Sequence, residues 1–453
     1  MKKDSSTSAS RSRRGPIDWS VFRPLLLLAV TVFIDLLGFG IILPNLPQYI
    51  ETAVGPNHRD AAFIGALLAA SYSLTQFLVA PLWGRYSDRV GRRPVILVSL
   101  LGVGLAFILF GLAGDRLWML FAARLLAGLL SSASIGVSFA YVADVTPPEK
   151  RAMGLGLLGA CFGLGFMMGP ALGGLLGHFN LALPAFVAAG MALINFGFTW
   201  RYLPESLSVE ERQKLAQQTR VNPVTLLGNV VTGPAGFLFV LTFIITFGFT
   251  ALEQTFSFYL LAALGVTQEN QPLVSGLILG MAGLSGILVQ GVLIGPLVAR
   301  FGEATIIRAG IVLMILGFAT FALPQTPLWL ALGPILLLST GRPLAAPALS
   351  ALVSRKADLG QGLTLSVSQS FDALARTVGP VIAGYLFAEV GPTSPYYVSA
   401  VAMLVALGVT WVKRKEMSEA EEIPVVPAEE ADENREKDER RNKPSQRELG
   451  ALR

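Results

Sequence analysis

The chain has 453 residues, of which 53% are hydrophobic and only 14% are charged, and its mean hydropathy is +0.60. A soluble globular protein carries roughly 25% charged residues, so this composition excludes an ordinary soluble domain. The net charge of +5 does not indicate nucleic-acid binding, because the basic residues lie in loops between apolar runs. The single cysteine, Cys161, excludes an internal disulfide and a metal site built from cysteines.

Apolar runs in chain order predict twelve membrane-spanning helices, since about 20 helical residues cross a bilayer. We place them at 24–46, 61–83, 94–114, 117–143, 152–177, 181–203, 235–264, 272–298, 306–324, 327–352, 361–388 and 395–412. The predicted fold is therefore an all-α integral membrane protein. A basic leader (1–23) precedes a six-helix bundle (24–203), and a linker (204–234) with a short amphipathic helix leads to a second bundle (235–412). The charged tail (413–453) is predicted to be disordered.

The placement of positive charge predicts the orientation. Of the 35 Lys and Arg residues, 30 fall in the termini and in the loops on the same side of the membrane, whereas the opposite loops hold only Arg59 and Arg116. Positively charged loops stay in the cytoplasm, so both termini are predicted to be cytoplasmic.

Two motifs recur along the chain and predict that the two bundles are related halves. They are Gly84-x4-Arg89-x-Gly91, repeated as Gly295-x4-Arg300-x-Gly302, and Gly169-Pro170, repeated as Gly379-Pro380. Duplicated halves with a binding site between them are a common plan in transporters.

Charged residues inside the predicted spans are the candidate functional groups. They are Asp35, Arg124, Glu253, Arg342, Asp372 and Arg376. Such groups are costly in hydrocarbon unless they are neutral, paired or facing water. Asp35 and Glu253 occupy counterpart spans of the two halves, where a carboxyl group suits exchange of a proton for substrate. Asp372 and Arg376 are spaced to share a helix face and to neutralise each other, so structural pairing is the alternative to a functional role.

The loop after the second span reads Gly84-Arg-Tyr-Ser-Asp88-Arg89-Val-Gly91-Arg92-Arg93, with an acid among four arginines. Ion pairs here can exist in only one conformation of two rocking bundles; the alternative is simple anchoring in the cytoplasm. The loop matches, residue for residue, a signature of the major facilitator superfamily, which this chain therefore resembles. The resemblance implies that Asp88, Arg89 and Arg92 brace the inward-closed state, with the Asp contacting the start of the eleventh helix. The second copy has lost the acid, at Ala299, which weakens any clamp there.

The fifth span carries a run of small residues: Gly156, Gly165, Gly169, Pro170, Gly173, Gly174 and Gly177. Glycines every four residues leave one helix face almost without side chains, which permits close packing against another helix. Packing alone is the simpler interpretation. The pattern also resembles the antiporter signature of drug:proton antiporters in this superfamily, and the resemblance implies export.

From Asp35 to Glu205 the chain most clearly resembles the tetracycline efflux proteins. We expect Asp35 and Glu253 to carry proton coupling as intramembrane carboxyl groups, and the resemblance to drug antiporters implies the same role for Arg124. Glu253 and Arg342 have no counterpart in the tetracycline pattern. Gln76, Asn195 and Gln290 fit the resemblance, and we expect them to line the substrate cavity together with Asp372, Arg376 and Arg342. The second half departs from the pattern, because a histidine of span eight is replaced by Gly286 and an acid of span nine by Met314.

The leading hypothesis is a proton-coupled exporter of amphipathic drugs, such as tetracycline-like compounds, or of metabolites. We expect it to be a monomer in the plasma membrane, which is the inner membrane in bacteria. Its expected partners are a small-molecule substrate, protons and membrane lipid. A facilitator or symporter of an endogenous metabolite is the alternative with the same fold. No nucleic acid, metal or cofactor is expected, and no enzyme motif occurs in a credible context.

Overall fold

The computed structural model describes residues 19–55, 57–146, 148–217, 233, 235–323, 328–356 and 361–422. This part of the chain is helical and contains no strand. The first half comprises α1 (Trp19–Ile42), η1 (Leu43–Asn45), α2 (Leu46–Val54), α3 (His58–Val90), α4 (Arg92–Gly111), α5 (Leu117–Val145), α6 (Pro148–Phe179) and α7 (Leu183–Tyr202). The second comprises α10 (Gly236–Ala263), α11 (Gln271–Leu288), η2 (Val289–Leu293), α12 (Ile294–Phe301), α13 (Glu303–Phe321), η3 (Leu328–Ala331), α14 (Leu332–Arg355), α15 (Gln361–Glu389) and α16 (Ser394–Val412). Two short helices, α8 (Val209–Gln217) and α17 (Arg414–Glu422), follow the two halves.

The helices follow the predicted spans closely, which confirms an all-α membrane fold. Ten of the described helical segments are long and apolar enough to cross a membrane. The two other long helices, α6 and α15, have 32 and 29 residues, which is also enough to cross a bilayer. The exact count of twelve spans stays a prediction. The residues before 19, the linker residues 218–232 and 234, and the tail beyond 422 lie outside the described residues.

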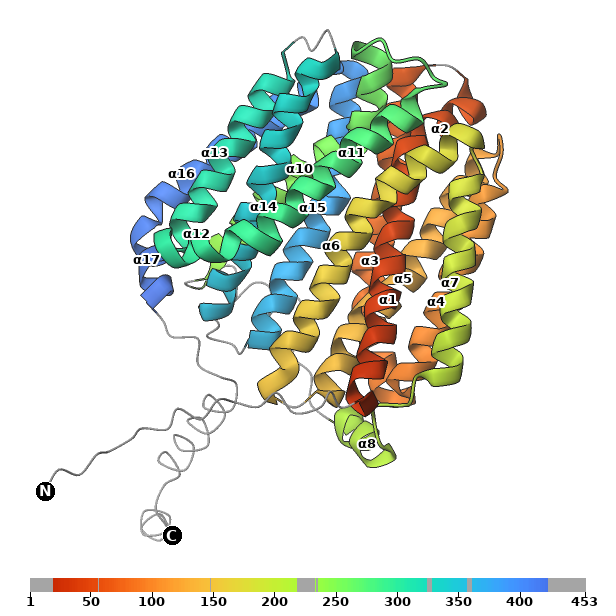
Figure 1. Ribbon diagram of the computed structural model, residues 1–453, viewed down its shortest axis with the longest axis vertical. Helices are drawn as coiled ribbons and strands as arrows, with labels where there is room; N and C mark the ends of the chain where they lie inside the picture. The colour runs from red at the N-terminus through yellow and green to blue at the C-terminus, as the bar shows by residue number, and fades with distance from the viewer. Residues whose placement is uncertain are drawn as a thin grey trace, which may run out of the picture.

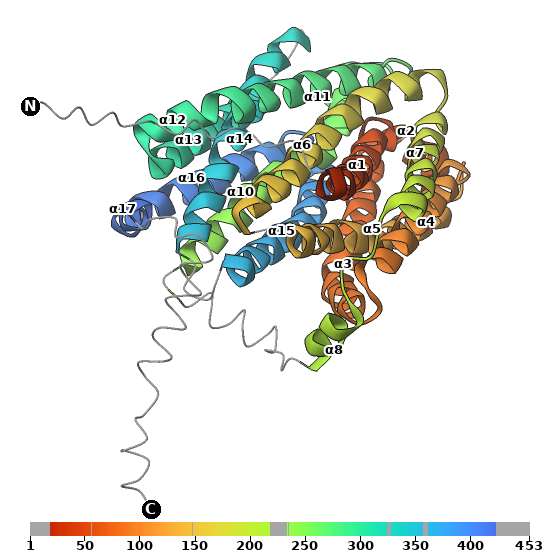
Figure 2. The same cartoon turned by 60° about the horizontal axis from the view of Figure 1, so that its bottom comes forward.

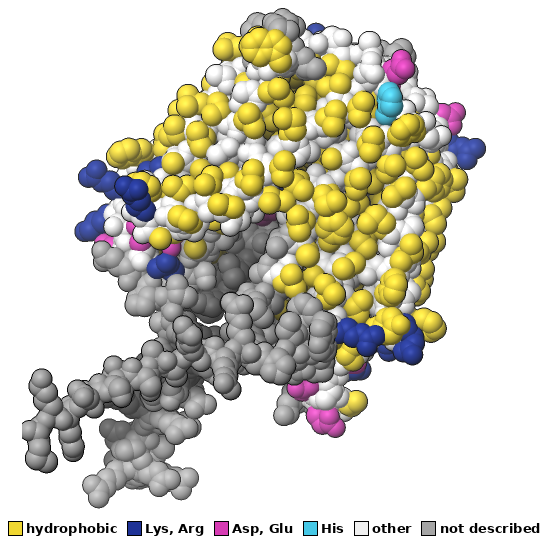
Figure 3. Space-filling view, in the orientation of Figure 1, with side chains coloured by type: hydrophobic (Ala, Val, Ile, Leu, Met, Phe, Trp, Pro, Cys, Tyr) yellow, Lys and Arg dark blue, Asp and Glu magenta, His cyan; other side chains and the backbone are white. Residues whose placement is uncertain are grey.

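Helices α1–α7 and α10–α16 form two bundles that lie side by side (Figure 1). In both views α6 runs along α11, which joins one bundle to the other (Figures 1 and 2). Helices α3 and α15 make the second large contact between the halves. Hydrophobic side chains cover much of the face seen in Figure 3, while charged side chains gather at its ends, as a bilayer requires.

The glycine face of α6 packs directly on the backbone of α1. Gly165, Gly169 and Gly173 lie on this face, and a Cβ atom added at Gly169 would lie 2.7 Å from the Leu37 carbonyl oxygen and 2.8 Å from the Gly40 Cα. Any side chain would therefore force the two helices apart. The close approach expected from the spacing of the glycines is confirmed.

A second side of α6 is equally close to α11 of the other half. A Cβ atom at Gly174 would lie 2.7 Å from the Gly276 Cα, and one at Gly276 would lie 2.7 Å from the Pro170 carbonyl oxygen. Helix α6 therefore packs between α1 and α11, and both contacts require glycine, because a side chain at these positions would clash with the neighbouring backbone.

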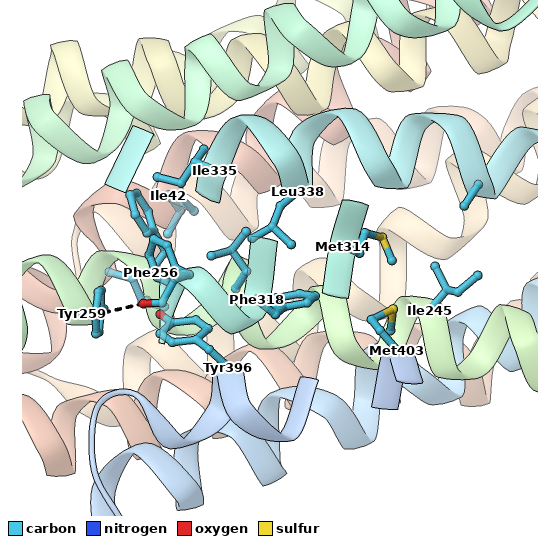
Figure 4. Packing of buried hydrophobic residues seen from close by; sticks show 14 of the residues in the cluster. Ile42, Ile245, Phe256, Tyr259, Met314, Phe318, Ile335, Leu338, Tyr396 and Met403 are labelled. Carbon is cyan, nitrogen blue, oxygen red and sulfur yellow. Dashed lines mark hydrogen bonds between the residues drawn. The ribbon is translucent and has the colours of Figure 1, made fainter. Parts of the chain in front are cut away.

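The core of the second half is built from large aromatic side chains (Figure 4). Tyr396 of α16 meets the rings of Phe321 and Tyr259 edge-on, at centroid distances of 4.6 and 5.2 Å. Its hydroxyl accepts a hydrogen bond from Thr255, at 3.0 Å. Such pairs stabilise a core beyond the area that they bury, so α10, α13 and α16 are firmly joined.

The loop predicted at 84–93 is in fact helical up to Val90. Helix α3 continues beyond its apolar part, so that its charged side chains lie outside the hydrocarbon region of the membrane. The break falls at Gly91, whose φ of 106° is unfavourable for other residues. Glu205 then accepts hydrogen bonds from the backbone N–H groups of Arg92 (2.7 Å) and Arg93 (3.2 Å) and caps α4.

The second half repeats this arrangement. Gly302, with a φ of 79°, separates α12 from α13, and Glu421 accepts a hydrogen bond of 2.5 Å from the backbone N–H of Ala304. Glu421 belongs to α17, where Met417 and Ala420 are buried. The prediction of disorder from residue 413 is therefore wrong for 413–422, because these residues cap and cover the end of α13.

Replacing Gly169 by Leu tests the contact between α6 and α1. Overpacking typically costs about 1–3 kcal/mol and occasionally more, and here the clash is with backbone that cannot rotate away. We expect a clear loss of thermal stability and of monodisperse protein in size-exclusion chromatography. The control is Gly197→Leu on α7, where an added Cβ meets nothing within 4 Å. Equal behaviour of the two variants would contradict the close-packing account.

Candidate functional site

Four intramembrane charges of the second half form one network between α10, α14 and α15. Glu253 is at its centre: its Oε2 accepts a hydrogen bond from Arg376 Nη1 at 3.1 Å, and its Oε1 lies 3.5 Å from Arg342 Nη1. Arg376 also reaches Asp372 at 3.0 Å, and Asp372 accepts a hydrogen bond of 2.6 Å from Thr246. Two acids and two bases thus balance each other in a region where an unpaired charge is costly.

This network confirms the predicted pairing of Asp372 with Arg376 and changes the interpretation of Glu253. The sequence predicts proton coupling for Glu253, with a structural partner in the bundle as the alternative, and the structure supplies two such partners, since Arg342 and Arg376 from other helices contact it. Arg342 additionally lies over the ring of Phe249, with its guanidinium carbon 4.4 Å from the centroid. The network therefore ties three helices of one half together.

Asp35 in the first half has no such partner. It is 4% exposed on α1, and its Oδ2 accepts a hydrogen bond from the hydroxyl of Ser134 on α5. Its Oδ1 has no hydrogen-bond partner. Within the described chain no base pairs with this carboxyl group.

Arg124 is the matching buried base, and it too lacks an acid in the part of the chain that the structure describes. It is 4% exposed, and its guanidinium carbon lies 5.2 Å from the ring centroid of Phe110 and 5.9 Å from those of Phe39 and Tyr72. The negative faces of aromatic rings can partly replace a counter-ion. The first half thus holds one acid and one base apart.

Hydroxyl groups of α5 connect this acid to other polar groups. The Tyr72 and Ser131 hydroxyls are 2.8 Å apart, and Gln76 Nε2 donates to Ser131 Oγ at 3.5 Å. Ser131 and Ser134 are three residues apart and so share a helix face. Sequence reasoning missed Tyr72 and both serines. The available signal was the cluster of serines at 131, 132 and 134 within an apolar span.

The two other predicted cavity residues lie in different surroundings. Gln290 is in the π-helical turn η2, a form of helix often found at functional sites. It points across to α6, since a Cβ at Gly163 would lie 4.0 Å from its Oε1. Asn195 does not line the region between the halves: it is 3% exposed and donates to Thr31 Oγ1 at 2.9 Å, joining α7 to α1. Its polarity is used for packing within the first half.

The arginine cluster near Gly84 forms ion pairs at the end of α3. Arg92 is buried and contacts Asp88 at 2.7 Å and Asp144 at 3.1 Å. Arg93 donates to the Trp200 carbonyl oxygen at 2.7 Å, whereas Arg89 is exposed. The expected contact with the start of the eleventh helix lies outside the described side chains, because those of residues 361–366 are not described.

Hydrogen bonds between the two halves gather at the end opposite these ion pairs. Gln271 donates to the Pro44 carbonyl oxygen at 2.9 Å, and Ser257 donates to that of Leu43 at 3.2 Å. His178 lies 3.3 Å from the Glu269 carbonyl oxygen. In Figure 1 this is the end at which α2 lies, opposite α8.

Comparison with known proteins assigns the family. Residues 28–362 match the family model of the Major Facilitator Superfamily, and residues 302–431 match that of Transmembrane secretion effector. The chain belongs to the major facilitator superfamily. It is therefore a membrane transporter and not an enzyme.

Its relatives in the superfamily include resistance proteins. The chain is 34% identical over 373 residues to the class C tetracycline resistance protein of Escherichia coli, covering 82% of this chain and 91% of that protein. It is 29% identical over 405 residues to multidrug resistance protein 2 of Bacillus subtilis (strain 168), covering 87% and 96%. The solved structure of the human organic anion transporter MFSD10 (TETRAN) is similar with a TM-score of 0.67, 26% identity and coverage of 87% and 100%.

Replacing Glu253 by Gln tests the charge network. The change leaves two arginines with one acid, and breaking a buried ion pair from one side costs about 3–5 kcal/mol. We expect a lower melting temperature of the purified protein in a thermal-shift assay. The double variant E253Q/R342Q restores the balance and should recover part of the loss. Equal melting temperatures of the single variant and the unmodified protein would contradict the network's structural role.

Proposed function

We propose that this transporter is a proton-coupled antiporter that exports amphipathic drugs or metabolites from the cytoplasm. The observation that carries the proposal is the pair of Asp35 and Arg124, both buried and neither paired with an opposite charge in the described structure. Relatives named for multidrug and tetracycline resistance support export as the direction.

Asp35 is suited to gain and lose a proton because its surroundings accept both forms. The Ser134 hydroxyl can donate to the carboxylate and can also accept from the protonated acid. A charged carboxylate in the membrane needs compensation, which a proton or a positively charged or hydrogen-bonding substrate can supply in turn. Competition of proton and substrate for one group is the requirement for antiport.

The second half supplies a rigid counterpart. The balanced network around Glu253 leaves no charge that must change during transport, so Arg342, Asp372 and Arg376 act as a fixed wall of the substrate cavity. Gln76 and Gln290 extend the polar lining from α3 and η2. A polar wall beside aromatic and aliphatic surface suits compounds with one polar and one apolar side.

The arrangement of contacts corresponds to the inward-facing state when the termini are cytoplasmic. The halves are joined by hydrogen bonds at the outer end, near Pro44 and Gln271, and by the close approach of Gly174 to Gly276. The Asp88–Arg92–Asp144 cluster lies at the inner end, and a contact of Asp88 with the start of the eleventh helix would brace the alternative state. Export then proceeds by rocking of the halves about the site between them.

Replacing Asp35 by Asn tests proton coupling. Asparagine keeps the size and the hydrogen bond to Ser134 but cannot exchange a proton, so substrate uptake driven by a pH gradient in proteoliposomes should fall to the level of protein-free vesicles. Asp115→Asn, in an exposed loop, is the matched control. Coupled flux at the unmodified rate in D35N would remove Asp35 from the mechanism, and uptake by the unmodified protein that ignores the gradient would indicate a facilitator.

A susceptibility panel tests the substrate class. Expression in an efflux-deficient bacterial strain should raise resistance to several amphipathic drugs, and D35N should abolish the gain. Tetracycline and lipophilic cations are compared directly. Resistance to none of the drugs, with the protein present in the membrane, would contradict drug export.

A further inference from the structure

Helix α7 presents an uncovered apolar stripe on the outside of the first half. Ile194, Phe198 and Tyr202 lie four residues apart on one face and are 64%, 53% and 40% exposed. The rings of Phe198 and Tyr202 stack at 6.3 Å. The opposite side of α7 packs on α4 and α1. Since α7 meets the criteria for a membrane span, this stripe faces the acyl chains of lipid.

Two arginines lie at the end of the stripe nearest α8. The guanidinium carbons of Arg23, from α1, and Arg201, from α7, lie 4.2 and 5.2 Å from the ring centroid of Tyr202. Neither guanidinium has an ion pair or a hydrogen bond in the described structure. Both are exposed. Two positive groups therefore share one aromatic ring with no acid between them.

A third arginine stands close by, and Glu205, three residues after Tyr202, is occupied elsewhere. Arg93 donates to the Trp200 carbonyl oxygen at 2.7 Å, while its Nε has no hydrogen-bond partner. Glu205 accepts from the backbone of α4 and lies 3.5 Å from Arg212. The acid thus does not neutralise the pair at Tyr202. Figure 3 shows Lys and Arg gathered where α1 and α7 end, beside the hydrophobic face.

We propose that Arg23 and Arg201 bind the headgroup phosphate of one anionic phospholipid, whose acyl chain lies along Ile194 and Phe198. Guanidinium groups match the geometry of a phosphate and bind it with two parallel hydrogen bonds. The apolar stripe runs without interruption into the basic end, which is the shape of a lipid and not of a small soluble anion. Trp200 and Tyr202 lie in the last turn of α7, and aromatic residues are enriched where spans meet the lipid headgroups.

The second half provides an internal comparison. Trp411 follows Trp200 by 211 residues, the offset of the repeat, and Arg308 lies over its ring at 5.5 Å. At the positions of Arg201 and Tyr202, however, stand Val412 and Lys413, and the lysine is paired with Glu416 at 2.7 Å. The repeat-related position at Trp411 therefore lacks the pair of guanidinium groups found at Tyr202, and lipid selection is expected at Tyr202 and not at Trp411.

The test uses Trp200, which is 60% exposed, as a reporter. The full chain is reconstituted in phosphatidylcholine vesicles in which a fraction of either phosphatidylglycerol or phosphatidylcholine carries brominated chains that quench tryptophan. The difference between the unmodified protein and Trp200→Phe isolates the signal of Trp200. We expect roughly threefold or stronger quenching by the brominated anionic lipid at equal mole fraction, since each arginine attracts an anionic headgroup.

The double variant R23Q/R201Q should abolish this preference, and R308Q, the matched control, should leave it unchanged. Both altered positions of the double variant are exposed, and its melting temperature in detergent checks that it is folded. Equal quenching by the two lipids in the unmodified protein, or a preference that survives in R23Q/R201Q, would overturn the proposal. Loss of the preference in millimolar inorganic phosphate would also overturn it, because the site would then be a general anion site and not one for lipid.

Discussion

The contact on which the structure most depends is the approach of α6 to two other helices without intervening side chains. Gly169 lies on the backbone of α1, which carries Asp35, and Gly174 lies on Gly276 of the other half. One helix thus sets both the position of the unpaired acid and the contact between the halves. A movement of one half against the other must either preserve the contact at Gly174 or break it, and no flexible side chain can absorb an intermediate position.

The two halves treat buried charge in different ways. The second half neutralises its charges within one network around Glu253, whereas the first half keeps Asp35 and Arg124 apart, each with a neutral substitute for a counter-ion. A balanced network keeps its charge state, because neutralising or removing one member would leave another charge buried without a partner. An unbalanced acid responds to its surroundings. The asymmetry fits a transporter in which one half senses protons and the other holds its shape.

Hydropathy and spacing were sufficient to predict the helices, the pairing of Asp372 with Arg376 and the bare face of α6, because all of these depend on local periodicity. They could not predict the partners of Glu253, since the register between α10, α14 and α15 is set by packing across the bundle. The prediction that Asn195 lines the cavity was wrong for the same reason: a polar residue in a span does not show which neighbouring helix its side chain faces. The serines of α5 were visible in the sequence, but only the structure shows that Ser134 reaches Asp35.

Helix α17 has a practical consequence for anyone who shortens or labels this chain. A version cut at Val412, where the last long helix ends, would lose Glu421, which accepts from the Ala304 N–H and whose carbonyl oxygen accepts from Arg355. The start of α13 would be left without its cap, and the apolar residues beneath α17 would meet water. Affinity tags and fluorescent fusions therefore belong after residue 422. Measurements on a chain ending at 412 would describe a protein without α17 and its contacts to Ala304 and Arg355.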